Sequence, residues 1–396
     1  MSIRKTFVIL QALLLAGMVM VPMVNADKAS SASDIVTLVD KNAISEDTAL
    51  QSARAAVEDF VSRGALDNNW DGATVDPKSD IIYDLNEKPL FYLFSVESKG
   101  KRIGEIKAAA SKVVGGAIVT IGPGAGPVDL DSAKTHAREI IEKEYKGTVI
   151  NSMTLVCYDY PDMAILFRFS APGSKEKTLI LDAYDFSVIP ESKQVSYYNG
   201  IHSSDISTRI ANAESEQDSL MNRQTVLSVK AGATKTLSGF PLYAQQANGW
   251  CPFATAQMIS GYYGYSRTQS GIASTMGISN PGNGATLQET LSNYYQLSTA
   301  SGGLGKPNSQ LRYTGMFSYD DFISNLSANR PQHASRYESL SLHARAVAGY
   351  SYSSSSSQYL YIYDPGPVNV GSLYWENWNT FLSGSNPVQG VIFIRN

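Results

Sequence analysis

The sequence predicts an α+β protein in which a duplicated region of helices and strands precedes a region where one helix packs on an antiparallel sheet. Three observations support this fold class. In the first half, a helical apolar pattern is twice followed by short strand-like segments. In the second half, a cysteine stands directly before a helix that begins with proline, and two strand-like segments near the end are joined by a serine-rich stretch. Separate runs of helices and strands are typical of the α+β class.

Residues 1–26 have the pattern of a secretory signal peptide. Arg4 and Lys5 precede an apolar run from Phe7 to Val21, and Val24-Asn25-Ala26 places small residues at a cleavage position. A membrane anchor is the alternative, because an apolar run of this length comes close to what a spanning helix needs. We expect the protein to be secreted, or to be held at the cell envelope if this segment is not cleaved.

The overall composition disfavours polymer-binding functions. The formal net charge is −4, and 17% of the residues are charged. A chain without a strong basic field has no general attraction for nucleic acid or for an anionic membrane. We therefore expect neither as a partner, apart from the membrane that the signal peptide meets during export.

Residues 27–202 contain two segments with the same order of elements, at about 45–110 and 130–190. The helical patterns open at Ser52-Ala53-Arg54 and at Ser132-Ala133-Lys134. Three strand-like segments follow each helix, at 81–84, 90–96 and 104–108 in the first copy and at 153–160, 164–170 and 178–184 in the second. Two copies of one such unit can stack into a single α+β domain.

Residues 203–237 are polar and contain few large apolar side chains. This composition predicts a linker or a weakly ordered helix that is open to proteolysis. Residues 238–396 then form the second domain, which is poor in charged residues and rich in Tyr, Ser and Gly.

The chain contains two cysteines, Cys157 and Cys251. Secreted domains that depend on disulfides usually have several. A Cys157–Cys251 disulfide is the alternative, but the two residues lie in different predicted domains. Cys157 falls in an apolar strand and is expected to be a buried structural thiol.

Cys251 has the better context for chemistry. Pro252 is favoured in the first turn of a helix, and the apolar residues Phe253, Ala256 and Ile259 continue with helical spacing. The unpaired N–H groups and the positive end of a helix dipole favour a thiolate at this position. A thiolate is the form that attacks a carbonyl carbon.

A cysteine nucleophile needs an imidazole, and the chain has four histidines. His136 and His202 are expected at the surface, and His333 in a polar loop. His343 instead opens a strand of small residues that is expected to form a hairpin with the strand 359–363. In that hairpin, Asp364 comes to the same end of the sheet as His343, where its carboxylate can orient the ring.

Gln245 and Gln246 stand six and five residues before Cys251. The side-chain amide of either one could join the backbone N–H of Cys251 in an oxyanion hole. Spacing alone does not choose between them.

Together these residues resemble papain-like cysteine peptidases. Asn248-Gly249-Trp250-Cys251 leading into a helix, then His343-Ala344 with Gly349-Tyr350, then Tyr363-Asp364-Pro365 resemble the double-glycine-leader (bacteriocin-processing) peptidases and the staphopain and streptopain group. The resemblance covers residues 238–396. It implies a papain-like fold, Cys251 as nucleophile, His343 as base and acid, Asp364 as the orienting residue and Gln245 in the oxyanion hole.

Two positions depart from the pattern of those families. Pro252 follows the cysteine where Gly or Ala is usual, and Leu342 precedes the histidine where Gly is frequent. Neither change removes a catalytic group. The first half resembles PepSY-like or streptopain-type prosegments, which implies a zymogen whose own N-terminal domain inhibits it.

Three functions remain open from the sequence. The first is a secreted cysteine endopeptidase that acts on a protein or peptide substrate. The second is another thiol acyl-transfer enzyme, such as an amidase or a transglutaminase-like protein, and the third is an inactive peptidase-fold binding protein at the cell surface. No cluster of His, Cys, Asp and Glu has metal-ligand spacing, so no cofactor is predicted.

Overall fold

The structure is a computed structural model that describes residues 32–144, 146–222, 232–338, 341–382 and 387–396. The predicted signal peptide lies outside these residues. Within the described ranges, none of the helices combines the length and the apolar character that crossing a bilayer requires.

The first segment of the N-terminal part is two helices followed by four antiparallel strands. The elements are α1 (Ala32–Lys41), α2 (Glu46–Ser62), β1 (Thr74–Asp84), β2 (Pro89–Ser98), β3 (Lys101–Ala109) and β4 (Ile118–Gly124). Helix α2 begins where Ser45 accepts a hydrogen bond from the backbone N–H of Thr48, a typical N-cap. Its buried face, including Ala53, Ala56 and Phe60, covers the sheet.

The second segment repeats the order of one helix and three antiparallel strands. These are α3 (Leu130–Glu144), β5 (Val149–Asp159), β6 (Asp162–Ser170) and β7 (Lys177–Asp182). Strands β1 and β5 pair in parallel, with Tyr83 opposite Val156, so the first strands of the two segments lie side by side. The first segment has one more helix and one more strand than the second, and the predicted duplication stays a prediction.

The predicted linker differs from the structure over part of its length. Residues Ile206–Asn222 form helix α4, which packs on α2 and buries Arg209, Glu216 and Leu220. The polar composition did not predict this packing, because polar side chains of the helix are buried with hydrogen-bond partners. The carboxylate of Glu216, for example, accepts a hydrogen bond from the backbone N–H of Ala117 at 2.7 Å. Residues 223–231 lie outside the described residues.

The C-terminal part consists of short helices gathered on one side of antiparallel strands. Its elements are β8 (Ala233–Thr236), α5 (Cys251–Tyr262), α6 (Gln269–Met276), α7 (Leu287–Thr290), β9 (Gln310–Tyr313), α8 (Tyr319–Ser327), β10 (Gln332–Glu338), β11 (Ser341–Ser354), β12 (Ser357–Asp364), β13 (Ser372–Asn377), α9 (Trp378–Leu382) and β14 (Val388–Phe393). Strands β11 and β12 form the predicted hairpin, with Ala346 opposite Tyr363. The strands extend further into the serine-rich stretch than predicted, since β11 continues to Ser354.

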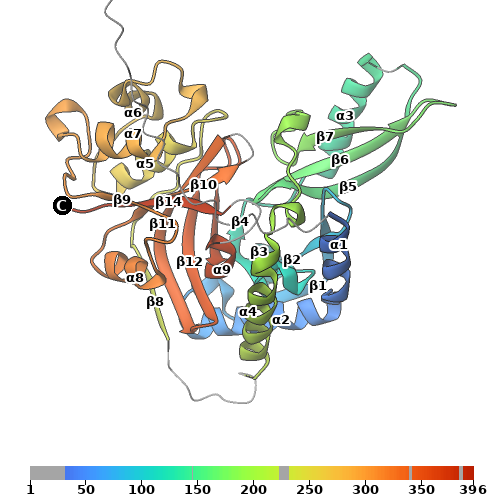
Figure 1. Cartoon of the computed structure of the whole chain (residues 1–396), viewed down its shortest axis with the longest axis horizontal. Coiled ribbons are helices and arrows are strands. Elements are labelled where there is room, and N and C mark those ends of the chain that lie inside the picture. The colour runs from blue at the N-terminus through green and yellow to red at the C-terminus, as the bar shows by residue number, and fades with distance from the viewer. Residues whose placement is uncertain (1–31, 145, 223–231, 339–340, 383–386) are drawn as a thin grey trace, which may run out of the picture.

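One sheet runs through both parts of the molecule (Figure 1). Its order is β7-β6-β5-β1-β2-β3-β4-β13-β12-β11-β10-β14-β9, with β8 paired to β11. The junction is the antiparallel pair β4–β13, in which Trp375 lies opposite Ile121 and Glu376 opposite Thr120. The α+β prediction is confirmed, and the two predicted domains share a continuous sheet.

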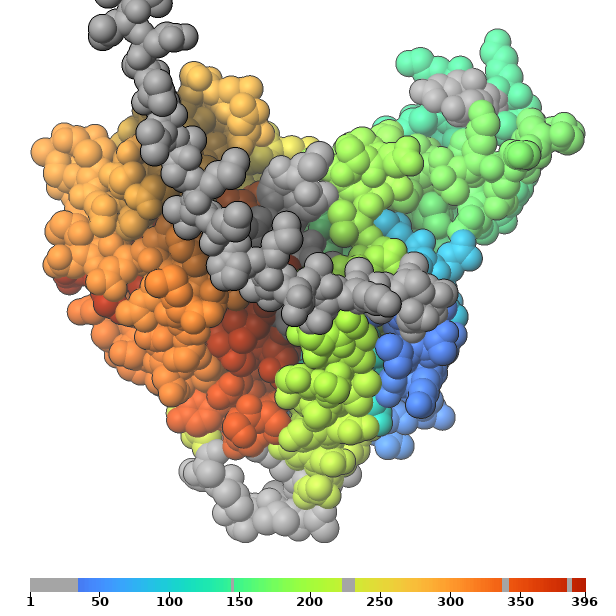
Figure 2. Space-filling view, in the orientation of Figure 1, coloured from blue at the N-terminus to red at the C-terminus, as the bar shows by residue number. Residues whose placement is uncertain are grey.

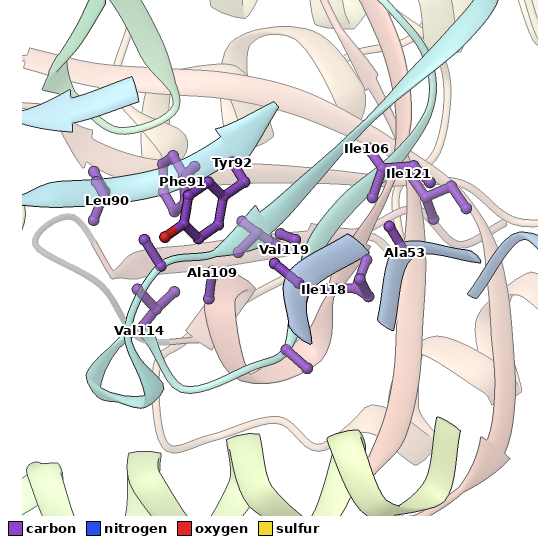
Figure 3. Packing of buried hydrophobic residues seen from close by; sticks show 14 of the residues in the cluster. Ala53, Leu90, Phe91, Tyr92, Ile106, Ala109, Val114, Ile118, Val119 and Ile121 are labelled. Atoms are coloured by element: carbon purple, nitrogen blue, oxygen red, sulfur yellow. The ribbon is translucent and has the colours of Figure 1, made fainter. Parts of the chain in front are cut away.

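The interior is also shared across the junction. Figure 3 shows the core of the N-terminal part, where Ala53 of α2 lies over strand residues such as Ile106 and Ile121. Tyr359 and Trp375 of the C-terminal part belong to the same buried cluster. A second cluster fills the C-terminal part between α5 and the strands, and includes Phe253, Ile259 and Val347.

Candidate active site

Cys251 is the first residue of helix α5, where the chain makes a tight approach to a neighbouring loop. Gly249 has a φ of 80°, and a Cβ at this residue would come within 2.2 Å of the carbonyl oxygen of Gly282. Only glycine fits such a left-handed and crowded position. Pro252 occupies the first turn of the helix, as predicted.

Helix α5 is held in place by its apolar side chains. Phe253, Met258 and Ile259 are completely buried, and the helix packs against strand β11. This packing brings the Sγ atom of Cys251 to 3.5 Å from the carbonyl oxygen of Leu342. The thiol therefore lies next to the residue that precedes His343.

His343 and Asp364 form a buried pair at the end of the β11–β12 hairpin. The Nε2 atom of His343 lies 2.7 Å from Oδ1 of Asp364. The same Oδ1 accepts a hydrogen bond from the backbone N–H of Gly366 at 2.9 Å, and Oδ2 accepts one from the hydroxyl of Tyr374 at 2.7 Å. The carboxylate is thus fixed by three donors, and the imidazole ring is fixed by the carboxylate.

The charge of Asp364 is stabilised by its surroundings. Burial by itself raises the pKa of this carboxyl, but the opposite charges of His343 and Arg345 and the hydrogen bond from Tyr374 outweigh burial and lower the pKa to about 2. Asp364 is therefore ionised at any pH near neutrality, which is the state that can orient and stabilise an imidazolium.

Gln245 lies in the same site with a fixed backbone and an unpartnered side-chain oxygen. Its N–H donates to the carbonyl oxygen of Pro365 at 2.8 Å, and its carbonyl oxygen accepts from the N–H of Asn369 at 2.9 Å. Its Oε1 atom is buried and has no hydrogen-bond partner. Gln246 is exposed and does not line the cleft described below. Of the two glutamines, it is therefore Gln245 whose side-chain amide borders the cleft.

These four side chains line one cleft with a volume of about 950 Å³. The C-terminal part contributes residues from the loops and strand ends around the thiol: Gln245, Asn248, Gly249, Cys251, Leu342, His343, Asp364, Gly366 and Tyr374. The N-terminal part contributes residues from β3 to β7 and the loops that follow: Lys107, Tyr158, Asp159, Pro161, Asp162, Asp182, Tyr184 and Ile189. Figure 2 shows that the C-terminal part, in orange, and the arm of α3 and β5–β7, in green, diverge toward the top of the view.

The remaining three histidines and Cys157 lie outside the His343–Asp364 pair. His136 and His202 are exposed, as expected. The prediction for His333 was wrong, because this residue lies in strand β10 and not in a loop, with its Nδ1 atom 2.9 Å from the hydroxyl of Tyr295. Cys157 is a buried free thiol in β5, and Cys251 is also free, so the alternative of a disulfide between them is not realised.

Sequence reasoning missed three residues that support the site. The hydroxyl of Tyr374 donates a hydrogen bond to Asp364, and Nη1 of Arg345 donates to that hydroxyl at 3.0 Å. Gln269 fixes the Gln245 segment, because its Nε2 donates to the carbonyl oxygen of Ala244 at 2.8 Å and its Oε1 accepts from the N–H of Gln246 at 3.1 Å. The sequence contains one indication of this support: Arg345 stands among the small residues of 343–350, and a charge in a buried strand needs a partner because an unpaired one is costly.

No arrangement of three or more His, Cys, Asp or Glu side chains that could bind a metal ion occurs within the described part of the chain.

Comparison with known proteins gives a match for the C-terminal part. Residues 237–385 match the model of the Peptidase_C39 like family. This range contains Cys251, His343 and Asp364, and the match supports a cysteine peptidase of that papain-like kind. A comparison with curated proteins finds no match.

Proposed function

We propose that this protein is a cysteine endopeptidase in which Cys251, His343 and Asp364 act as a catalytic triad. One observation carries the proposal: the thiol at the start of α5 and the paired His343–Asp364 side chains line the same cleft, next to the amide of Gln245. The family match over residues 237–385 supports the same reaction class.

The hydrogen bonds define how each group acts. Nε2 of His343 is engaged by Asp364 at 2.7 Å, so Nδ1 is the ring nitrogen that serves Cys251. Proton transfer from the thiol to Nδ1 leaves a thiolate and an imidazolium. The ionised Asp364 stabilises that imidazolium and keeps its orientation.

The proposed reaction proceeds through an acyl-enzyme. The thiolate of Cys251 forms a bond to the carbonyl carbon of the scissile peptide, and the carbonyl oxygen becomes an oxyanion that the amide of Gln245 and the backbone N–H of Cys251 stabilise. The C–N bond then breaks, and His343 gives its proton to the leaving amine. Water attacks the thioester, His343 takes a proton from that water, and the carboxylic acid product leaves with the thiol restored.

Export is part of the proposal and rests on residues 1–26. Mass spectrometry of the protein outside the producing cell tests it, with cleavage after Ala26 as the expected result. Finding the intact N-terminus bound to membranes would replace secretion with anchoring at the cell envelope.

The reaction class is tested by the products formed from an unlabelled protein substrate. Wild-type protein should generate new N-termini with incorporation of one oxygen from ¹⁸O-labelled water into each new carboxylate, and Cys251→Ala should generate none. Ammonia release or isopeptide bonds without new N-termini would assign the site to acyl transfer. No product and no thiol reactivity would leave the binding-protein alternative.

A further inference from the structure

A chain of buried polar contacts leads from the triad to the N-terminal part of the molecule. Tyr374 donates to Asp364, and Arg345 donates both to the hydroxyl of Tyr374 and to Oε2 of Glu376, the latter at 2.8 Å. The hydroxyl of Tyr160 donates to Oε1 of Glu376 at 3.1 Å. All of these side chains are at least nine-tenths buried.

Tyr160 is the N-terminal part's contribution to this chain. It lies between β5 and β6, and its ring packs against Phe91 and Tyr197 of the N-terminal core at centroid distances of 5.9 and 5.6 Å. Its neighbours Asp159 and Pro161 line the cleft. The same turn therefore contacts the buried support of the triad on one side and the cleft on the other.

The charges of the buried cluster balance only when its members stay together. Glu376 lies between Arg336 and Arg345, with Nη1 of Arg336 at 3.3 Å and Nη1 of Arg345 at 2.8 Å. The guanidinium of Arg336 also lies over the ring of Tyr160, 4.6 Å from its centroid. Exposing this cluster by removing the N-terminal part would change the environment of every charge that supports Asp364.

Other polar contacts between the N-terminal and C-terminal parts are also buried. Helix α4 places Glu216 where its carboxylate accepts hydrogen bonds from Tyr359, from Nδ2 of Asn377 at 2.9 Å and from the N–H of Ala117 at 2.7 Å. The indole N–H of Trp375 donates to the carbonyl oxygen of Ala65 at 2.9 Å. An inhibitory segment that must leave would expose these groups and an edge of the sheet at β13.

We propose that the N-terminal part is retained in the active enzyme, where it forms the second wall of the substrate cleft and positions the triad through Tyr160. This inference rests on the proposed function and departs from the zymogen expectation, because a domain that lines the cleft beside Cys251 is placed to bind substrate. Tyr160 is a positioning residue, because its hydrogen bond to Glu376 reaches Asp364 through Arg345 and Tyr374.

The first test cuts the connection between the two parts and leaves the complete protein present. A specific protease site is introduced within residues 223–231, the full chain is purified and then cleaved. We expect the two fragments to co-elute in size-exclusion chromatography and to keep the kcat/KM of the uncut protein to within about twofold. If the fragments separate and the C-terminal fragment alone is as active as the uncut chain or more active, the N-terminal part is a removable inhibitor and the inference is wrong.

Alkylation of Cys251 by iodoacetamide separates failure of the inference from failure of the proposed function. A C-terminal fragment that reacts rapidly on its own refutes the shared site but keeps the peptidase. If neither the cut nor the uncut protein reacts at Cys251 faster than a free thiol, both proposals fail.

The second test removes only the hydroxyl of Tyr160. Tyr160→Phe keeps the ring packing. Tyr197→Phe is the matched control, because Tyr197 is a buried tyrosine of the same core whose hydroxyl interacts with the carbonyl oxygen of Val114 and with Arg209, away from Glu376. Loss of a hydrogen bond to a charged group that takes part directly in the reaction would lower the rate by about ten- to hundredfold. Since Tyr160 acts through others, we expect about a tenfold fall in kcat with unchanged KM, accompanied by a shifted acid limb of the pH–rate profile. Equal kinetics and equal pH profiles in the two variants would overturn the positioning role.

Discussion

Each half of the molecule contains one buried cysteine, and the surroundings of the two thiols differ. Cys157 lies in strand β5 inside the N-terminal core, where burial raises the pKa of the thiol well above its ordinary value despite the opposing charge of Lys107. Cys251 is about as well buried, but it begins a helix and lines the cleft beside the His343–Asp364 pair. Burial by itself therefore keeps a thiol protonated and inert, and reactivity has to come from a helix start and an imidazole.

The histidines of the two neighbouring strands β10 and β11 show the same contrast. Burial lowers the pKa of His333 to about 3, and the partner of its Nδ1 is a neutral tyrosine hydroxyl. His343 has an ionised carboxylate as its partner and faces the cleft. A buried imidazole can carry a charge only where such a carboxylate balances it.

The largest expected effect distinguishes the two cysteines. Cys251→Ala should lower kcat/KM by a factor on the order of 10⁴ or more, because the nucleophile is lost. Cys157→Ala removes only a small buried side chain and should leave kcat/KM within about twofold, with a loss of stability of about 1 kcal/mol. Peptide hydrolysis and thermal unfolding of both variants check this. Activity in Cys251→Ala would mean that the site has been misassigned.

The next effect distinguishes the two histidines. His343→Ala should reduce kcat by about 10²- to 10⁴-fold, the usual contribution of a general acid and base. His333→Gln should keep most of the activity, since the amide can still bond to Tyr295. Steady-state kinetics above pH 7 measure both. A larger loss of kcat in the His333 variant than in the His343 variant would reverse the assignment.

A smaller effect separates the two neighbouring glutamines. Gln245→Ala should lower kcat by about 10²- to 10³-fold, as the loss of one oxyanion donor does. Gln246→Ala serves as the control because that side chain is exposed, and it should change kcat by less than about threefold. Comparable losses in the two variants would remove Gln245 from the oxyanion hole.

The smallest expected effect is on acid stability. The pKa of Asp364 in the folded protein is about 2, lower than the ordinary pKa of an aspartate, which is about 3.9. The carboxylate therefore stabilises the folded state above about pH 4, and this stabilisation is lost as the pH falls through 2. Its size is on the order of 2 to 3 kcal/mol, because each unit by which the pKa is lowered corresponds to about 1.4 kcal/mol.

Denaturant unfolding of wild type and Asp364→Asn between pH 5 and pH 2 measures this contribution. The difference in unfolding free energy between the two proteins should shrink as the pH falls. A difference that stays constant over this range would show that Asp364 is not ionised by its pairing with His343.

Sequence reasoning succeeded where the determinants were local. Pro252 and the apolar spacing after Cys251 predicted the helix. The hairpin brought Asp364 to His343 because both residues lie at the open end of two paired strands, where Ala346 is opposite Tyr363.

The remainder depended on contacts between distant segments. Tyr160 and Glu376 are 216 positions apart, and nothing in either local pattern indicates the other. His333 was assigned to a loop because its neighbours are polar, but in the folded protein that segment is an inner strand whose polar groups find partners. The segment of helix α4 was assigned to a linker or a weakly ordered helix because it is polar. In the folded protein Glu216 of this helix is buried, and Tyr359, Asn377 and Ala117 supply the hydrogen-bond donors to its carboxylate.

The most direct test of the triad is alkylation of the two cysteines at different pH values. Wild type and His343→Ala are treated with iodoacetamide and with an epoxide peptidase inhibitor between pH 5 and pH 9, and the labelled residue is identified by mass spectrometry. An ordinary thiol, with a pKa of about 8.5, is almost fully protonated at pH 5 to 6. We predict rapid labelling of Cys251 alone in this acid range, lost in His343→Ala, with Cys157 labelled only after unfolding. Slow labelling of Cys251, or labelling that does not depend on His343, would contradict a thiolate–imidazolium pair.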